Sequence, residues 1–306
     1  MLLIAIAVAV ATIPSGLPAA VTVVLALGME AILKRGGLVR NLLAAETLGS
    51  TTVILTDKTG TLTEARMKLA EVHTFESFGM TAERVDWTKD DHFLLTCATL
   101  AADAFVEEGE DAPRKLTVHG RPVEKAIVLG GLETGISQEE LTKENKRLDY
   151  LQFSSDRRFS ASLNINDSKK DRRVYVNGAP EMLLERATHL YKEGRSIKFA
   201  DNVKSEFLKL MSNRSQDAMR LIGVAYKDTD WEELPEEEDV SLITKDLTFV
   251  GFMALEDPIR LDAEESIEEV RQAGAKVIMI TGDNPDTGAA IGRRVGVLQA
   301  HGRVIL

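Results

Sequence analysis

Two apolar segments that each end in a small polar turn set the strongest limit on how this chain can fold. The first is residues 53–55, Val-Ile-Leu, which lead to Asp57 and a turn of lysine, threonine and glycine. The second is residues 275–280, which lead to the tripeptide Thr-Gly-Asp at 281–283. Short apolar strands that alternate with helical segments are typical of a doubly wound α/β domain. We therefore expect both segments to be strands of one sheet.

The long section between these strands predicts an inserted domain rather than two domains in tandem. Helical patterns at residues 263–274 and 286–296 flank the second strand. The section from residue 66 to residue 257 contains strand-like pieces (RRVYVNG, SASLNIN, LTFVGFMAL) and helical pieces (APEMLLERATHL, VKSEFLKLMSNRSQDAMRLIG). The expected fold is thus α/β, with an α+β domain inserted into the doubly wound one.

The beginning of the chain has the composition of a membrane span. Residues 1–28 carry no charged side chain, and about 20 apolar residues are enough for a helix to cross a bilayer. Basic residues at positions 34–40 predict a cytoplasmic location for the end of the span. The segment PSGLP at 14–18 should interrupt the helix, because proline removes a backbone donor. Broken helices in membranes often build ion sites.

Two other interpretations of this apolar run remain open. A signal peptide would need a basic region before the apolar run, and the sequence has none there. A buried helix of a soluble domain is the second alternative. A single span cannot form a transport path, so the transmembrane interpretation predicts further spans outside this sequence.

Charge and cysteine content exclude several classes of protein. The net charge of −11 argues against a nucleic-acid partner, whose binding surface should be basic. Cys97 is the only cysteine, so neither an intrachain disulfide nor a cysteine-rich metal site can form. Cys97 lies in an apolar run, and we expect it to be a small core residue.

Asp57 lies at the end of its expected strand, a position where a side chain can bind or react with a ligand. Ligands of open parallel sheets bind outside the carboxyl ends of the strands. The small residues near Asp57 allow backbone N–H groups to approach an anion, and Lys58 adds a compensating charge. A carboxylate can attack a phosphoryl group and form an acyl phosphate, with Mg²⁺ as the natural charge carrier. The alternative is an aspartate that caps an ordinary turn.

The residue two positions after Asp57 affects how long such an intermediate would last. A carboxylic acid there could act as a general acid–base and speed hydrolysis, but Thr59 is poorly suited to that role. We therefore expect a longer-lived phospho-aspartate, which suits an enzyme that changes shape before it releases phosphate.

Residues 57–63, DKTGTLT, resemble the phosphorylation motif of P-type ATPases. Other segments resemble further motifs of this family, in the family's order: PSGLP at 14–18 (the unwound ion-binding segment of the fourth transmembrane helix), GRPVEKA at 120–126, FSSDRRFS at 153–160, NGAPE at 177–181, DPIR at 257–260 and TGD at 281–283. The pattern is most similar to the calcium-pump-like cation transporters.

The resemblance implies a fold and an activity. The fold would be a haloacid-dehalogenase-like Rossmannoid phosphorylation domain, residues 37–65 and 258–306, with an inserted nucleotide-binding domain, residues 66–257. A transmembrane helix, residues 1–36, would precede it. The activity would be ATP-driven cation transport through a phospho-aspartate at Asp57, with Mg²⁺ as cofactor. The partners would be ATP, the transported cation and the lipid bilayer. The full protein would be multi-pass, in the plasma membrane, with cytoplasmic catalytic domains.

The resemblance also implies roles for individual residues. Asp57 would be the nucleophile, Lys58 and Thr59 would bind the phosphoryl group, and Asp57 and Thr59 would hold Mg²⁺. Phe153 would stack on adenine, since an aromatic face accepts a base. The remaining nucleotide and phosphate contacts would come from Glu124 at the adenine edge, Arg158 and Arg220 at the triphosphate, Asn177 and Gly178, Asp257 and Arg260 at the hinge, and Thr281, Gly282 and Asp283. Without the family, Phe153 would be a core residue and each arginine a solvated one.

Departures from the family pattern change some of these expectations. Asn177 stands where the family has lysine, so we expect lower nucleotide affinity or another cation in its place. Gly178 still permits close backbone approach. Pro14 and Ser15 would contact the transported ion, but Ser15 replaces a glutamate ligand, and a hydroxyl coordinates Ca²⁺ more weakly than a carboxylate.

Other functions remain as alternatives. The sequence reaches Leu306 without the family's GDGxND motif, so we expect this fragment alone neither to transport ions nor to turn over efficiently. A soluble phosphatase of the haloacid dehalogenase type would usually carry aspartate at the position of Thr59. An inactive nucleotide-binding fragment is the third possibility.

Overall fold

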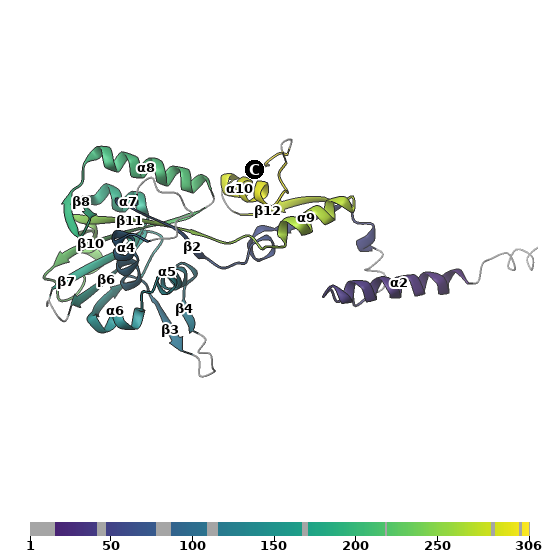
Figure 1. The fold of residues 1–306 in the computed structure, drawn as a ribbon, viewed down its shortest axis with the longest axis horizontal. Helices are drawn as coiled ribbons and strands as arrows, with labels where there is room; N and C mark the ends of the chain where they lie inside the picture. The colour runs from purple at the N-terminus through teal and green to yellow at the C-terminus, as the bar shows by residue number, and fades with distance from the viewer. Residues whose placement is uncertain are drawn as a thin grey trace, which may run out of the picture. The chain divides into compact units, whose positions relative to one another are not determined.

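The computed structural model describes residues 16–41, 47–77, 87–108, 116–166, 171–217, 219–282, 285–299 and 302–305. The chain divides into two compact units. Unit 1 comprises Met1–Leu55 and Glu268–Ile278, and unit 2 comprises Thr56–Ile267 and Met279–Leu306. Figure 1 labels α2 of unit 1 and many of the helices and strands of unit 2.

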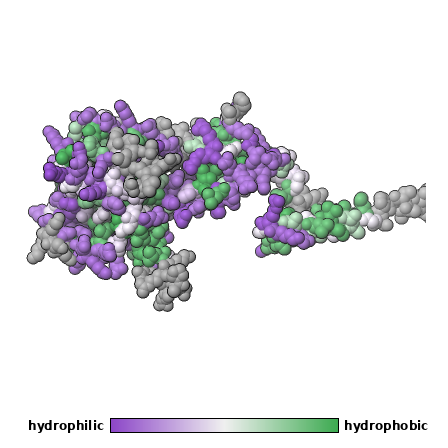
Figure 2. Space-filling model, in the orientation of Figure 1, coloured by the Kyte–Doolittle hydropathy of each residue, from purple (hydrophilic) through white to green (hydrophobic). Residues whose placement is uncertain are grey.

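Helix α2 (Leu17–Lys34) of unit 1 is apolar, and none of its residues is buried. Its 18 residues are long and apolar enough to cross a membrane, and its surface in Figure 2 is mostly hydrophobic. Pro18 lies in the first turn, where a missing N–H breaks no helical hydrogen bond. The helix thus begins within the segment PSGLP, with Leu17 and Pro18 in its first turn. Pro14 and Ser15 lie outside the described residues, so the predicted interruption stays a prediction.

Strands β1 (Val53–Asp57) and β12 (Lys276–Ile280) pair in a two-stranded sheet, as the sequence predicted for its two apolar segments. The backbone N–H of Lys276 also donates to the carbonyl of Thr52 at 2.8 Å, one residue before β1. Helix α9 (Ala263–Gln272) leads into β12, and α10 (Pro285–Arg294) follows it. The predicted strand–helix alternation is therefore present at this end of the chain.

A mixed sheet of eight strands forms most of unit 2. Seven strands lie in the order β5-β6-β7-β10-β11-β8-β9, and β2 also pairs with β11. The pairings are antiparallel except for that of β8 with β11. The strands are β2 (Lys68–Thr74), β5 (Asn145–Leu151), β6 (Phe159–Asn166), β7 (Arg172–Gly178), β8 (Ala187–Lys192), β9 (Arg195–Lys198), β10 (Arg220–Thr229) and β11 (Leu247–Glu256). A separate hairpin consists of β3 (Ala104–Glu108) and β4 (Leu116–Gly120).

Two hydrophobic cores cover the two faces of this sheet. Helices α4 (Lys89–Leu100) and α5 (Pro122–Glu133) contribute Leu94 and Ile127 to the first core, and α6 (Gln138–Glu144) borders it. Helices α7 (Pro180–Arg186) and α8 (Asp201–Gln216) contribute Leu183 and Phe207 to the second. A short 3₁₀ helix, η2 (Glu237–Thr244), precedes β11. Buried side chains alternate between the two cores along β7 and β10, as the two-residue period of a strand requires.

The predicted elements of the middle section are largely confirmed, and two helix boundaries are wrong. The strands predicted at SASLNIN, RRVYVNG and LTFVGFMAL correspond to β6, β7 and β11. Helix α7 ends at Arg186, so ATHL begins strand β8 instead of continuing the helix. Helix α8 ends at Gln216, and RLIG belongs to β10. Pairing with β11 outweighs the local helical pattern in both places. Cys97 is fully buried, as predicted.

Candidate functional site

The first candidate group is the loop that follows β1. Asp57 ends the strand, and its Oδ1 accepts a hydrogen bond from the backbone N–H of Lys58 at 2.8 Å. The turn η1 (Lys58–Leu62) contains Gly60 at φ +79°, a left-handed conformation that favours glycine. The side chains of Asp57 and Thr59 are exposed. Asp57 therefore caps its turn, as the alternative interpretation predicted, and its carboxylate also stays open to a ligand.

Asp257 and Arg260 hold this loop from a distant part of the sequence. Asp257 Oδ2 accepts a hydrogen bond from Thr63 Oγ1 at 2.6 Å, and its Oδ1 accepts one from the Arg66 N–H at 3.1 Å. Arg260 donates from Nη2 to the carbonyl of Gly60 and from Nε to the carbonyl of Thr63, each at 3.2 Å. Both residues were predicted at a hinge, and the structure places them against the phosphorylation-like motif.

Backbone hydrogen bonds strengthen the same connection, which we call the loop junction (residues 60–66 and 257–260). The N–H of Glu64 donates to the carbonyl of Pro258 at 2.9 Å, and the N–H of Arg260 donates to the carbonyl of Leu62 at 3.0 Å. Thr63 is fully buried between these strands of chain. The conformation of the Asp57 loop thus depends on residues nearly two hundred positions later, at sequence separations of 191 to 200.

The second candidate group surrounds Glu124 in the first turn of α5. Glu124 is buried, with 7% of its surface exposed. Arg121, the residue before the helix, donates from Nε to Oε2 at 3.1 Å and from Nη2 to Oε1 at 2.9 Å. The hydroxyl of Tyr150 on β5 donates to Oε1 at 3.4 Å. We call these three residues the Glu124 cluster.

Two members of the Glu124 cluster, Arg121 and Tyr150, have a raised pKa. The hydrogen bond to Glu124 raises the pKa of the Arg121 guanidinium, because it stabilises the charged form. Burial raises the pKa of Tyr150 to about 12, and the negative charge of Glu124 adds to the effect. At neutral pH the cluster therefore contains a fixed cation, a paired carboxylate and a neutral phenol.

Asn177 and Gly178 lie at the end of β7, close to the Glu124 cluster. Ser160 lies near both, since its Oγ donates to the carbonyl of Asn177 at 3.5 Å and its side chain also interacts with Tyr150. Asn177 is 5% exposed, and its Nδ2 donates to the carbonyl of Ala98 on α4 at 2.8 Å. The amide at this position is therefore tied to the protein interior and does not extend into solvent as a lysine would.

The backbone of Gly178 approaches its neighbours too closely for a side chain. A Cβ atom at this position would lie 2.7 Å from Phe159 Cβ and 2.8 Å from the carbonyl oxygen of Arg158. Arg158 itself is exposed, has φ +63° and forms an ion pair with Glu181. Packing inside the sheet thus requires glycine at position 178, independently of any contact with a ligand.

Phe153 and Arg220 are both accessible from solvent. Phe153 lies in the loop between β5 and β6, and it is 38% exposed. The core position that would otherwise be expected for this ring is therefore wrong. Arg220 is the exposed first residue of β10. Three residues later on β10, Gly223 lies opposite Gly178, so Arg220 lies near this end of the sheet.

The tripeptide after β12 is described only in part. Thr281 is half-buried and its methyl group lies against α10, where a Cβ at Gly288 would be 3.2 Å from Thr281 Cγ2. Gly282 is exposed, and Asp283 lies outside the described residues. The predicted roles of these three residues stay predictions.

Sequence reasoning missed Thr63, Arg121 and Tyr150. Arg121 and Glu124 are three residues apart at the start of a helix, a spacing at which side chains meet, so this pair was visible in the sequence. Tyr150 is 26 residues from Glu124, and no local pattern points to it. In the described part of the chain, no group of three or more histidine, cysteine, aspartate or glutamate side chains is arranged to hold a metal ion.

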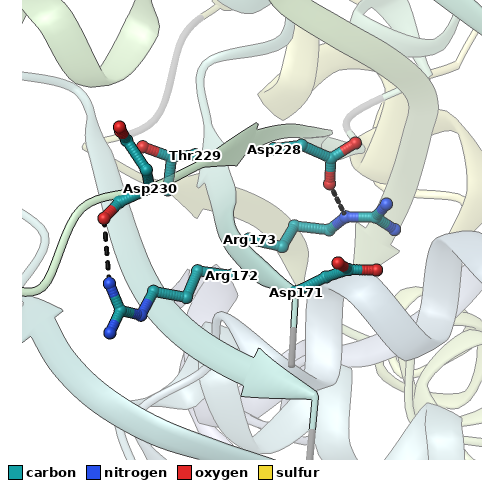
Figure 3. Close-up of a pocket in the computed structure, with 6 residues that line it drawn as sticks. All are labelled: Asp171, Arg172, Arg173, Asp228, Thr229 and Asp230. Carbon is teal, nitrogen blue, oxygen red and sulfur yellow. Dashed lines mark hydrogen bonds and ion pairs between the residues drawn. The ribbon is translucent and has the colours of Figure 1, made fainter. Parts of the chain in front are cut away.

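An open hollow lies at the opposite end of β7 and β10 (Figure 3). Its lining residues are Asp171, Arg172, Arg173, Asp228, Thr229 and Asp230. Arg173 Nε donates to Asp228 Oδ1 at 2.6 Å, and Arg172 Nη1 donates to the carbonyl of Asp230 at 2.9 Å. Both arginines are thus engaged with neighbouring groups, and none of the predicted site residues lines this hollow.

Comparison with known proteins gives a consistent set of similarities. The family described as P-type ATPase, cytoplasmic domain N, matches residues 92–262. Calcium-transporting ATPase 1 of Lactococcus lactis subsp. lactis (strain IL1403) is 35% identical over 300 residues, which are 96% of this chain and 32% of that protein. The calcium-transporting ATPase of Bacillus subtilis (strain 168) is 30% identical over 321 residues, 100% of this chain and 35% of that protein.

A relative that is named for another ion has a sequence identity in the same range. Potassium-transporting ATPase alpha chain 2 of Cavia porcellus is 32% identical over 321 residues, 98% of this chain and 31% of that protein. The chain thus spans 31–35% of the length of these three relatives.

Proposed function

The chain belongs to the P-type ATPase family, and on this premise we propose that it is the nucleotide-binding and phosphoryl-accepting part of an ATP-driven cation pump. The family match covers 171 residues, 92–262, which is more than half of the 306 residues. The observation that carries the proposal is the exposed carboxylate of Asp57 at the end of β1, in a turn that Asp257 and Arg260 hold in place.

Asp57 is the proposed nucleophile. Its Oδ1 is oriented by the N–H of Lys58, and Oδ2 attacks the terminal phosphorus of ATP. A bond forms between Oδ2 and phosphorus, the bond from phosphorus to the bridging oxygen breaks, and ADP leaves with the electron pair. The ammonium of Lys58 and the backbone N–H groups of the turn offset the charge of the phosphoryl group. Thr59 supplies no acid–base group, so water attacks the phospho-aspartate slowly.

Mg²⁺ is the proposed cofactor, and it would neutralise charge on the transferred phosphoryl group. Mg²⁺ is usually held by one or two carboxylates together with phosphate oxygens and water. The donor set at this loop fits that pattern, since the Asp57 carboxylate and the Thr59 backbone carbonyl lie on an exposed turn. Both residues would hold the ion.

ATP is the proposed ligand of the inserted domain. The exposed ring of Phe153 would stack on adenine, and Glu124 would face the edge of the base. The amide of Asn177 is turned toward Ala98, so a cation for the phosphates has to come from Arg158 or Arg220. Gly178 would let the ligand approach the backbone closely.

We further propose the domain division that the motifs imply. Residues 37–65 and 258–306 would form the haloacid-dehalogenase-like phosphorylation domain, and residues 66–257 the inserted domain. The pairing of β1 with β12 supports this division, because it joins segments from both sides of the insertion. Residues 1–36 would lie in the membrane, with the catalytic domains in the cytoplasm, and α2 has the required length and apolarity.

The transported species is proposed to be a cation that passes near Pro14 and Ser15. The relatives above are named for calcium in two cases and for potassium in one. Ser15 offers a neutral hydroxyl where calcium pumps have a carboxylate, so the proposal extends to a cation and to no particular ion.

The test of the proposed function is phosphorylation by γ-labelled ATP. The longest natural form of the protein, incubated with ATP and Mg²⁺ and quenched in acid, should carry an acid-stable label that hydroxylamine removes. Asp57→Asn should abolish the label, and Asp171→Asn, a change at another exposed aspartate, should leave it intact. A label that survives Asp57→Asn would reject the assignment.

A further inference from the structure

A buried charged cluster links strand β2 to helix α8. Glu71 and His73 lie two residues apart on β2, so they share one face of the sheet, and they are 7% and 4% exposed. Glu71 Oε2 accepts a hydrogen bond from His73 Nε2 at 2.7 Å. Arg214 Nε, in the last turn of α8, lies 2.7 Å from the same oxygen, off the direction of a hydrogen bond, so this contact is an ion pair. We call these three residues the Glu71 clamp.

The surroundings of the Glu71 clamp are apolar on one side and open on the other. The rings of His73 and Phe252 lie 4.7 Å apart between centroids, and Phe252 belongs to the second core. Arg214 is 25% exposed, and its Nη1 also pairs with Asp217 at 3.1 Å. A buried ion pair is weak evidence for stability, because the loss of water offsets the attraction between the charges. The clamp is therefore better explained by the one arrangement of β2 and α8 that it fixes.

The Glu71 clamp lies beside an irregularity in the pairing of β2 with β11. Glu71 is the register partner of Ala254, whereas Leu69 is the partner of Leu255, so Ala70 is an extra residue on β2. A bulge of this kind bends its strand and leaves one residue out of the ladder. The ladder alone therefore fixes β2 less firmly here than elsewhere, and the side-chain contacts of Glu71 hold the strand at this point.

Strands β2 and β11 lead directly to the loop junction. β2 begins at Lys68, two residues after Arg66, whose backbone N–H donates to Asp257. β11 ends at Glu256, the residue before Asp257. A change in the direction of β2 at the bulge would therefore be passed to the loop junction after only a few residues.

The row of residues at the bulge also includes a proposed phosphate contact. Leu255 pairs with Leu69 on one side and with Arg220 on the other. Only one further pair separates this row from the ends of β2 and β11 at the loop junction. The direction of the two strands beyond the bulge thus helps to set where the Asp57 loop lies relative to a phosphate at Arg220.

We propose that Glu71 and Arg214 are positioning residues for phosphoryl transfer, because by holding the bulge of β2 against α8 they set the direction in which β2 and β11 present the Asp57 loop to the nucleotide. This inference rests on the proposed function, in which Asp57 attacks ATP bound to the inserted domain. Neither residue belongs to the candidate nucleotide site, so the clamp acts on the rate of transfer and not on the binding of ATP. A displacement of about 1 Å far from the reacting atoms can slow a reaction by about 100-fold.

The test separates ATP binding from phosphoryl transfer in the longest natural form of the protein. Rapid-quench labelling with γ-labelled ATP and Mg²⁺ gives the rate at saturating ATP, and competition against a fluorescent trinitrophenyl analogue gives the affinity for ATP. Glu71→Gln removes the charge with little change of shape. It should slow labelling by about 10- to 100-fold and leave the affinity for ATP nearly unchanged. Arg214→Met should have the same effect, and Arg214→Lys, which keeps the charge, should recover part of the rate.

Hydrogen exchange provides a second measurement, which does not depend on phosphorylation. The backbone N–H groups of Glu64 and Arg66 are bonded across the loop junction. Peptides that cover residues 60–66 should therefore exchange faster in Glu71→Gln and in Arg214→Met than in the wild type.

Asp217→Asn is the matched control. Asp217 is exposed and pairs with the same arginine, Arg214. The change removes this carboxylate and keeps the pair with Glu71, so labelling and exchange should equal those of the wild type. Circular dichroism and thermal melting establish that each variant is folded. Arg214 lies partly at the surface, so Arg214→Met carries the test if Glu71→Gln proves unstable.

The outcomes separate this inference from the proposed function. If folded Glu71→Gln and Arg214→Met label at the wild-type rate, or if exchange in residues 60–66 is unchanged, the inference is overturned. Loss of affinity for ATP with an unchanged rate at saturating ATP would also overturn it, because the clamp would then act on the nucleotide site. A wild type that takes no label counts against the proposed function, and exchange then decides alone whether the clamp holds the loop junction.

Discussion

Single side chains in this protein connect segments that the sequence keeps far apart. Thr63 is the best example, because its hydroxyl donates to Asp257 Oδ2 at 2.6 Å across a separation of 194 residues. Thr63 is fully buried, so water cannot replace the bond if it is lost. One hydroxyl thus helps to fix the loop that carries Asp57.

We expect Thr63→Val to destabilise the protein by roughly 1.5–3 kcal/mol, the usual contribution of a hydrogen bond to a charged group. Valine has nearly the shape of threonine, so the loss reflects the missing hydroxyl, which also lies 3.2 Å from the carbonyl of Lys58. Urea unfolding of the full chain measures the change. Thr63→Ser should recover most of it, and Thr142→Val, at an exposed threonine on α6, should have little effect. Equal stability of Thr63→Val and wild type would show that the Thr63 hydroxyl does not stabilise the loop junction.

At the scale of elements, the ends of three strands meet where the candidate nucleotide site lies. Phe159 on β6 and Gly223 on β10 are the register partners of Gly178 on β7. The start of α7 also packs there, since a Cβ at Gly223 would lie 2.6 Å from Pro180 Cα. Two glycines in one row therefore allow the sheet and the helix to approach closely.

Gly178→Ala should separate these elements. The added methyl group would overlap the Phe159 side chain and the backbone of Arg158, and overpacking of this kind costs about 1–3 kcal/mol. Thermal unfolding should show the loss, and nucleotide binding should weaken if β7 borders the site. Gly49→Ala is the matched control, because no atom lies within 4 Å of its added Cβ. A Gly178→Ala protein as stable as wild type would mean that β6 and β7 can shift to accommodate the methyl group with little cost in free energy.

The sequence correctly predicted features that depend on neighbouring residues, and it failed where a feature depends on a partner far away in the sequence. Strand β11 was predictable because its apolar run is local and nine of its ten residues are buried. The helical pattern failed at β8, where Ala187 pairs with Leu247, because no local signal reports that partner. The same contrast between local and distant partners applies to the candidate site. The strand and turn around Asp57 were visible in the sequence, whereas the contact of Tyr150 with Glu124 depends on how β5 and α5 pack.

At the scale of the whole molecule, the tyrosines report on the integrity of unit 2. The chain has four tyrosines, and all of them lie in or beside its large sheet: Tyr150, Tyr175, Tyr191 and Tyr226. Burial is the first cause of a raised pKa for each of them, to about 12 for Tyr150 and Tyr191. Burial disfavours the charged phenolate, so each ring stays protonated while the fold is intact.

These shifts predict a loss of stability at high pH. Above the unfolded pKa of about 10, the unfolded chain releases its phenolic protons while the folded chain keeps them, so unfolding becomes more favourable as pH rises toward 12. The contribution of the tyrosines is fully present below pH 10 and disappears as pH passes through the folded values. Phenolate absorbance should therefore rise at higher pH for the native protein than for the protein in guanidinium chloride, and its rise should coincide with loss of circular dichroism. Native tyrosines that titrate near pH 10 with the circular dichroism unchanged would mean that solvent reaches the phenols in the folded sheet.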